Sequence, residues 1–181
     1  MDSLLNDEKT IKKIIRKTKT KRNLFAVIAK ILLIVIIIYV LFAFILGITR
    51  VSGLSMYPRM SDSDLVLYYR LDNDIKIGDV VVFERDGNTY ILRVIGTENQ
   101  TIDINKEGNL IIDGHEVEEK VLYKTHKDKT SDIKFPYKVP KGHYFVLGDF
   151  RVSSVDSRNF GSIDKEKING TVINILRSRD L

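Results

Sequence analysis

Ser55 is the residue whose setting suggests chemistry, in the stretch RVSGLSMYPRM at residues 50–60. A serine hydroxyl is a weak nucleophile until a neighbouring base accepts its proton. The chain contains no cysteine, which excludes thiolate catalysis and Cys-based zinc sites. Its three histidines, His115, His126 and His143, lack the spacing of metal ligands. We therefore expect no metal and no cofactor, and the function depends on whether Ser55 has a base.

Residues 31–48, just before Ser55, form an apolar run of 18 residues without a charge, ILLIVIIIYVLFAFILGI. Together with the apolar residues before it, this run reaches the roughly 20 residues that a bilayer-spanning helix needs. A cleaved signal peptide has a shorter apolar region of about 7–15 residues and a small-residue cleavage site. The sequence GITRVSG is a poor site of that kind. We therefore predict an uncleaved transmembrane helix over residues 24–48.

Residues 1–23 carry the excess positive charge of the chain. The formal net charge is +5, and this segment alone holds eight basic and three acidic residues. The rest of the chain is neutral, so the basic pI does not indicate a nucleic-acid-binding face. Basic residues beside a span favour the cytoplasmic side. The pattern predicts a single-pass protein of the cell membrane, with a cytoplasmic N-terminal tail, an extracytoplasmic C-terminal domain and the lipid bilayer as a partner.

The domain after the span, residues 49–181, is predicted to be mainly β. Short segments rich in Val, Ile, Tyr and Phe alternate with Gly, Asp and Asn, which is typical of strands and turns. Asp86-Gly87 is a two-residue hairpin signal. The polar, lysine-rich segment 99–140 is predicted to be an insertion or cap. The predicted strands cover residues 64–71, 78–85, 89–96, 109–114, 143–149 and 171–177.

Four motifs in this order, SGLSMYP, GDVVVF, LRVIG and GDFRVSSVDSRNFG, resemble those of bacterial type I signal peptidases of the Gram-positive kind. The resemblance extends from the anchor to the closing INGTVINIL. It implies a membrane-anchored serine endopeptidase fold whose partners are secreted preproteins. Ser55 matches the nucleophile, Met56 the methionine beside the substrate site, and Gly53 the glycine of the same box. The backbone N–H of Ser55 is then expected to contribute to the oxyanion hole.

The resemblance also assigns supporting roles to residues further along the chain. The serine at the place of Ser154 orients the catalytic lysine in this family, and the pair Asp156–Arg158 is structural. Two positions depart from the pattern, with Phe150 in place of asparagine and Arg59 in place of threonine. The supporting residues are Asp79, Arg93, Gly148, Asp149, Ser154, Asp156, Ser157 and Arg158.

The general base of the family is missing. The lysine that precedes the arginine of the LRVIG motif is replaced by Leu92, and a leucine side chain accepts no proton. The substitutes considered in the sequence are Lys76 and five lysines of the segment 99–140, at positions 120, 124, 127, 129 and 134. Both sets are predicted to lie away from Ser55.

Two functions remain open on these residues. The first is a non-catalytic member that binds extended segments of secreted preproteins or pilin subunits, with weak or no proteolysis, and assists pilus assembly, as some related Gram-positive proteins without a complete dyad do. The second is an active signal peptidase that uses Ser55 and an unidentified base. Retention of Ser55 favours the second, whereas Leu92, Phe150 and Arg59 favour the first. The sequence predicts no oligomeric state.

Overall fold

The computed structural model describes residues 23–119, 121–128 and 130–177. The chain divides into two compact units, Met1–Phe44 and Ile45–Leu181, each of which is described by itself. The predicted basic tail, apart from Asn23, lies outside the described residues.

The first unit contains an apolar helix that is long enough to cross a membrane, judged by length and composition. It spans Asn23–Ile45, and its last turn, Leu41–Ile45, is a π-helix (η1). The side chains along it are exposed. The helix is shorter than the predicted range 24–48, because the last three residues of that range belong to a strand.

Strand β1, Leu46–Arg50, begins directly after the helix and pairs with β2, Leu65–Tyr69. Gly47 faces Tyr68 in this pairing, and a Cβ at Gly47 would collide with the tyrosine ring. Hydropathy alone does not separate a membrane helix from an apolar strand. The apolar run therefore did not predict where the helix ends.

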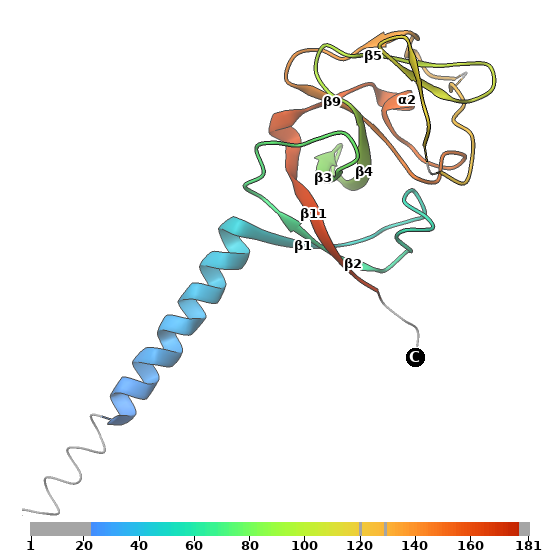
Figure 1. The fold of residues 1–181 in the computed structure, drawn as a ribbon. Coiled ribbons are helices and arrows are strands. Elements are labelled where there is room, and N and C mark those ends of the chain that lie inside the picture. Colours follow the sequence, from blue (N-terminus) through green and yellow to red (C-terminus); the bar gives the residue numbers. More distant parts are fainter. Residues whose placement is uncertain (1–22, 120, 129, 178–181) are drawn as a thin grey trace, which may run out of the picture. The chain divides into compact units, whose positions relative to one another are not determined.

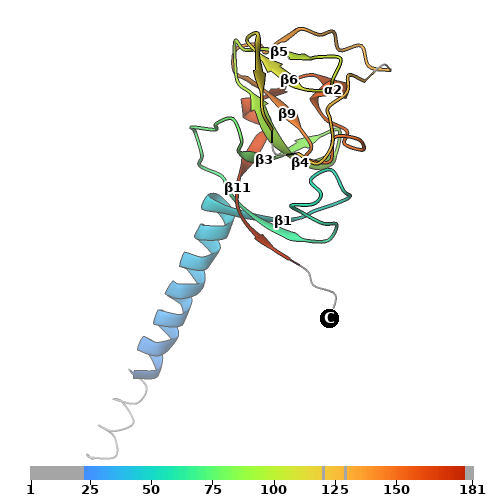
Figure 2. The same cartoon turned by 45° about the vertical axis from the view of Figure 1, so that its right-hand side comes forward.

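The second unit is built on a seven-stranded sheet in the order β1-β2-β11-β3-β4-β9-β10, with antiparallel neighbours (Figures 1 and 2). All six predicted strands are present, and five of them lie in this sheet. The five are β2 and four further strands: β3, Val80–Arg85; β4, Asn88–Gly96; β9, His143–Leu147; and β11, Ile168–Leu176. The sheet ends with β10, Ile163–Asp164. The short helix α2, Ser157–Phe160, precedes this strand in the chain, and the short helix η2, Lys165–Lys167, follows it.

The predicted hairpin turn connects β3 to β4. Arg85 pairs with Asn88 across it, which leaves Asp86 and Gly87 as the two loop residues. Both have positive φ, 50° and 76°, as a type I′ turn requires. The turn places β4 beside β3, and buried side chains of both strands, Val81 and Leu92 among them, join the larger hydrophobic core.

Residues 101–138 of the polar segment form a second sheet of four strands, in the order β7-β6-β5-β8. Apolar side chains of β5 and β6, with Ile102 fully buried, pack on Phe145 and Leu147 of β9 as a second core. Polar residues alternate with the apolar ones, so the polar composition of the segment did not indicate three of these four strands. The strands are β5, Thr101–Ile104; β6, Leu110–Ile112, within the predicted segment 109–114; β7, His115–Val117; and β8, Tyr137–Lys138.

Candidate functional site

Ser55 and Leu92 line the same groove, a cavity of about 520 Å³. Residues 49–52, Ser55 and Met56 form one side, residues 87–92 form the other, and Val155 completes the lining. The leucine side chain is fully buried, whereas Ser55 is half-buried. The structure therefore brings the predicted nucleophile and the position of the missing base together.

The turn that carries Ser55 is held from both ends. The carbonyl of Ser55 accepts a hydrogen bond from the Phe150 N–H at 2.9 Å. Met56, the next residue, is 1% exposed and belongs to the larger core. Gly53 has a φ of +82°, where a side chain would be strained, and its N–H donates to Asp62 at 2.7 Å. These contacts fix the backbone on which the serine hydroxyl is mounted.

Ser154 approaches Ser55 closely because Gly148 lies between them. A Cβ at Gly148 would lie less than 3.0 Å from both the Ser154 Oγ and the Ser55 carbonyl oxygen. Glycine is the only residue that fits this space. The hydroxyl of Ser154 is buried and has no hydrogen-bond partner in the part of the chain that the structure describes. An amine at the position of Leu92 is the partner that the resemblance assigns to this hydroxyl.

Residues of the kinds that usually act as general bases, His, Lys, Asp and Glu, are absent from the described lining of the groove. Arg50 and Tyr90 are its ionisable residues. A guanidinium offers no acceptor for a proton, and a phenol hydroxyl is a weak acceptor. Neither is suited to take a proton from Ser55.

The lysines that were considered as substitute bases are engaged elsewhere or do not line the groove. Lys76 lies 3.0 Å from Asp74, whose hydrogen bond and charge raise the pKa of the lysine above its ordinary value. Lys124 donates to Asn109, and Lys127 contacts Asp103 at 2.6 Å. Lys134 is exposed. The remaining two, at positions 120 and 129, lie outside the described residues.

The segment Gly148–Arg158, here called the shoulder, carries paired charges. Asp149 accepts two hydrogen bonds from the Arg93 guanidinium, at 2.7 and 2.6 Å. Arg93 also donates to the Gly78 carbonyl at 2.7 Å. Arg59 lies 3.8 Å from the same carboxylate. Asp79 follows Gly78 in the chain, and its carboxylate accepts the backbone N–H of Lys76 at 2.7 Å.

Asp156 and Arg158 form a buried ion pair at the end of the shoulder. The carboxylate of Asp156 is fully buried and accepts from Arg158 Nε and Nη2, both at 2.9 Å. The same carboxylate accepts the N–H of Arg158 at 3.1 Å, which caps helix α2, and the N–H of Gly148 at 3.1 Å. Ser157 accepts the Val146 N–H at 2.9 Å. The shoulder is thereby tied to β9 and to the backbone beside Ser55.

The comparisons with known proteins agree on one family. The sequence profile described as "Signal peptidase, peptidase S26" matches residues 24–176. The chain belongs to this family. It is 34% identical over 169 residues to a signal peptidase I of Bacillus licheniformis, covering 86% of this chain and 90% of that protein. It is 37% identical over 180 residues to signal peptidase I T of Bacillus subtilis (strain 168), covering 92% and 89%.

A solved structure, that of a signal peptidase I from Enterococcus faecalis V583, is also similar to this chain. It is 27% identical, has a TM-score of 0.48, and covers 56% of this chain and 98% of that one. The Gram-positive type that the motifs indicated fits these relatives.

This signal peptidase family member contains two sets of contacts, around Arg151 and around Phe150, that the sequence did not predict. The Arg151 guanidinium is buried and binds Glu119 through two hydrogen bonds of 2.6 Å, and it also donates to Thr125. The Phe150 ring meets Tyr57 and Tyr123 edge to face, with centroids 6.0 and 5.2 Å apart. Spacing in sequence gives no indication of pairs that are 27 or more residues apart, as Arg151–Glu119 and Phe150–Tyr123 are.

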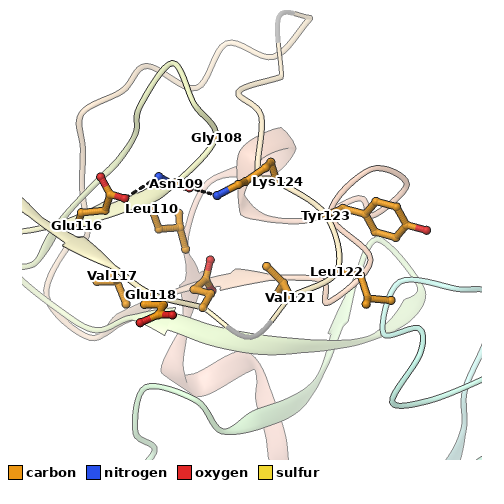
Figure 3. A pocket seen from close by; sticks show the side chains of 11 residues that line it. Gly108, Asn109, Leu110, Glu116, Val117, Glu118, Val121, Leu122, Tyr123 and Lys124 are labelled. Carbon is orange, nitrogen blue, oxygen red and sulfur yellow. Dashed lines mark hydrogen bonds between the residues drawn. The ribbon is translucent and has the colours of Figure 1, made fainter.

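A second cavity, also of about 520 Å³, lies beside the smaller sheet (Figure 3). Leu110, Glu116 and Val121 line it, and Glu116 accepts hydrogen bonds from the amide of Asn109 and from that of Asn105. Its lining contains neither Ser55 nor a residue of the shoulder. We therefore place the candidate site at the Ser55 groove.

Proposed function

We propose that this signal peptidase family protein binds extended segments of secreted or surface preproteins at the outer face of the cell membrane, with weak or no proteolysis. One observation carries the proposal: Leu92 is buried in the groove beside Ser55, and the Ser154 hydroxyl has no partner in the described chain. Both features fit a site from which the catalytic amine is missing.

The missing base decides between binding and cleavage. A serine hydroxyl attacks a peptide carbonyl only as its proton is taken up. In serine hydrolases, removal of the nucleophile or its base lowers kcat by roughly 10⁴ to 10⁶, or about 5–8 kcal/mol in activation free energy. A bound peptide would therefore remain uncut over the time in which a complete dyad cleaves it many times.

The groove retains the features that hold an extended peptide. Residues Asn88–Leu92 of β4 pair with β3 on one side, whereas the pairing with β9 begins at Arg93. Strand β1 pairs with β2 alone among the described strands. Two unpaired strand edges therefore border the groove. A peptide that adds a strand to such an edge gains affinity from backbone hydrogen bonds and specificity from alternate side chains.

Pilin subunits are a class of preprotein that fits this proposal, because the resemblance includes Gram-positive relatives that assist pilus assembly without a complete dyad. The alternative function is that of an active signal peptidase with an unidentified base. The defined backbone position of Ser55, held by Phe150 and by the buried Met56, favours that alternative. The two functions predict opposite results for cleavage by wild type, and Leu92→Lys tests whether a missing amine is the cause of low activity.

The location of the binding site at the outer membrane face follows from the apolar helix Asn23–Ile45 and the eight basic residues before it. The helix is proposed to span the membrane with the basic tail in the cytoplasm. Protease added to intact protoplasts should then digest the β domain and leave the anchor. Digestion of the N-terminal tail alone would instead indicate the opposite orientation, with the tail outside the cell.

The test of the function is Leu92→Lys in the full chain, incubated in detergent micelles with a preprotein that carries a signal peptide. The new amine would enter the groove beside Ser55, where burial favours the neutral form and the Ser154 hydroxyl can orient it. We expect little or no cleavage by wild type and measurable cleavage by the variant. Gel analysis of the released mature protein measures both.

Two controls separate the functions. The double variant Leu92→Lys with Ser55→Ala should lose the gained cleavage, and Leu92→Met should remain inactive because it adds no amine. Strong wild-type cleavage that disappears in Ser55→Ala would establish the active-enzyme alternative. Wild type that neither cleaves nor retains a preprotein segment would contradict both functions.

A further inference from the structure

We propose that Tyr57, Phe150 and Tyr123, here called the aromatic platform, form a subsite for an aromatic or branched aliphatic side chain of the bound peptide. The subsite would receive the part of the peptide that extends past Ser55, away from the groove. This inference rests on the proposed function, since it names a side-chain preference for the same bound peptide.

The three rings come together from three separate segments. Phe150 lies between the two tyrosines, and both contacts are edge to face, with interplanar angles of 79° and 74°. This geometry matches the electrostatic preference of aromatic pairs, in which a ring edge meets a ring face. The platform therefore has a defined arrangement.

The platform is attached to Ser55 through the backbone. The Phe150 N–H donates to the Ser55 carbonyl at 2.9 Å, and Tyr57 follows Ser55 by two residues in the same turn. None of the three aromatic residues lines the groove, although Ser55 does. Ser55 therefore belongs to the groove and is joined to the platform through its backbone, so a peptide that fills the groove and passes Ser55 would have the rings within reach.

Tyr123 is held in place by the residues on either side of it. Arg151 binds the Glu119 carboxylate through two hydrogen bonds of 2.6 Å and also donates to Thr125. Arg158 donates to the carbonyl of His126 at 3.1 Å. Tyr123 also lines the cavity beside the smaller sheet, and Figure 3 shows its side chain pointing away from Leu110 and Glu116. Its ring contacts Phe150, with the centroids 5.2 Å apart.

The surface of the platform is open and apolar. Tyr57 and Tyr123 are 43% and 41% exposed, and neighbouring side chains of Leu54, Leu122 and Val152 are exposed as well. Aromatic residues with an apolar face and a polar tip are enriched at binding interfaces. The absence of charge on these six side chains favours an apolar side chain over a charged one. Phe150 is central, and the family pattern has asparagine there.

The experiment uses the full chain in detergent micelles and a series of fluorescent, extended peptides rich in alanine and threonine. Each peptide carries one phenylalanine at a successive position, and a peptide with serine at that position is its reference. We expect the affinity to rise about tenfold when phenylalanine reaches one position, or two alternate positions, of the series. Phe150→Asn and Tyr123→Ser should each remove most of this rise.

Ile173→Ser is the matched control, because Ile173 is an exposed apolar residue of β11, which contributes neither to the platform nor to the groove lining. It should leave the position dependence unchanged, and melting temperatures of all variants verify the fold. Equal affinity for every peptide, or a rise that persists in Phe150→Asn, would overturn the platform while leaving peptide binding intact. Failure of the whole series to bind would overturn peptide binding itself, and the platform with it.

Discussion

The groove and the shoulder meet at Ser55, yet they differ in whether their polar side chains have partners. In the shoulder, the buried charges of Asp156 and Arg151 have partners in Arg158 and Glu119. At the groove, Leu92 occupies the position that the resemblance assigns to a lysine, and the hydroxyl of Ser154, itself a residue of the shoulder, has no partner among the described residues. The charged side chains of the shoulder are paired, whereas the lysine that the resemblance assigns to position 92 is absent from the sequence.

The difference follows from the cost of each change to folding. Loss of one partner of a buried ion pair leaves an uncompensated charge, which costs roughly 3–5 kcal/mol. Replacement of a buried lysine by leucine removes an ionisable amine from an apolar setting and leaves at most a hydroxyl without a partner. The fold therefore tolerates the loss of the base much better than the loss of a shoulder charge. Under the proposed function, catalysis and stability would depend on different polar residues within the same small region.

The largest stability effect is expected at the buried pair of the shoulder. Arg158→Ala leaves the fully buried carboxylate of Asp156 without its guanidinium, and we expect a loss of roughly 3–5 kcal/mol in the free energy of unfolding. Thermal and denaturant unfolding of the full chain in micelles measure this loss. Lys76→Ala is the control, since its partner Asp74 is exposed and the melting curve should stay unchanged. Similar curves for the two variants would contradict the distinction between the regions.

A smaller loss is expected at Gly148, where shoulder and groove meet. Gly148→Ala would place a methyl group against both Ser154 Oγ and the Ser55 carbonyl oxygen. Overpacking of this kind costs typically about 1–3 kcal/mol. Adding Ser154→Gly removes one of the two collisions and should recover part of the stability, as measured by denaturant unfolding. A fully stable Gly148→Ala variant would show that Ser154 and Ser55 are less closely packed.

Local patterns predicted the elements of this fold that depend on neighbouring residues. Runs of Val, Ile and Tyr predicted strands such as β3 and β4, and Asp86-Gly87 predicted the turn between them. The end of the helix at Ile45 was not predictable, because Leu46–Arg50 is as apolar at its start as the helix before it. Its assignment to a strand depends on pairing with β2, which lies about twenty residues away in the chain.

The candidate site divides in the same way. The motif resemblance predicted that Ser55 and Leu92 belong to one site, and the structure places both in the groove. The contact of Arg151 with Glu119 was not predictable, since Glu119 lies in a polar segment without a motif. The absence of a described hydrogen-bond partner for the Ser154 hydroxyl was also not predictable from the sequence, because it depends on every neighbour of that atom.

The smallest stability effect is expected at Ser154 itself. A buried hydroxyl without a partner contributes an unrecovered desolvation cost, so Ser154→Ala should change the free energy of unfolding by no more than about 1 kcal/mol, in the stabilising direction. Denaturant unfolding measures the change. A loss of several kcal/mol would mean that the hydroxyl makes a hydrogen bond in the folded protein.

The same substitution becomes informative in the Leu92→Lys background. There the hydroxyl of Ser154 gains an amine to bond, so Ser154→Ala should lower the gained cleavage while the melting temperature stays close to that of Leu92→Lys alone. A hydroxyl that contributes to activity only when an amine is present would act as a positioning group for that amine. If Ser154→Ala leaves the gained cleavage unchanged, the amine at position 92 is oriented by other groups, and the groove differs from a working dyad by more than its base.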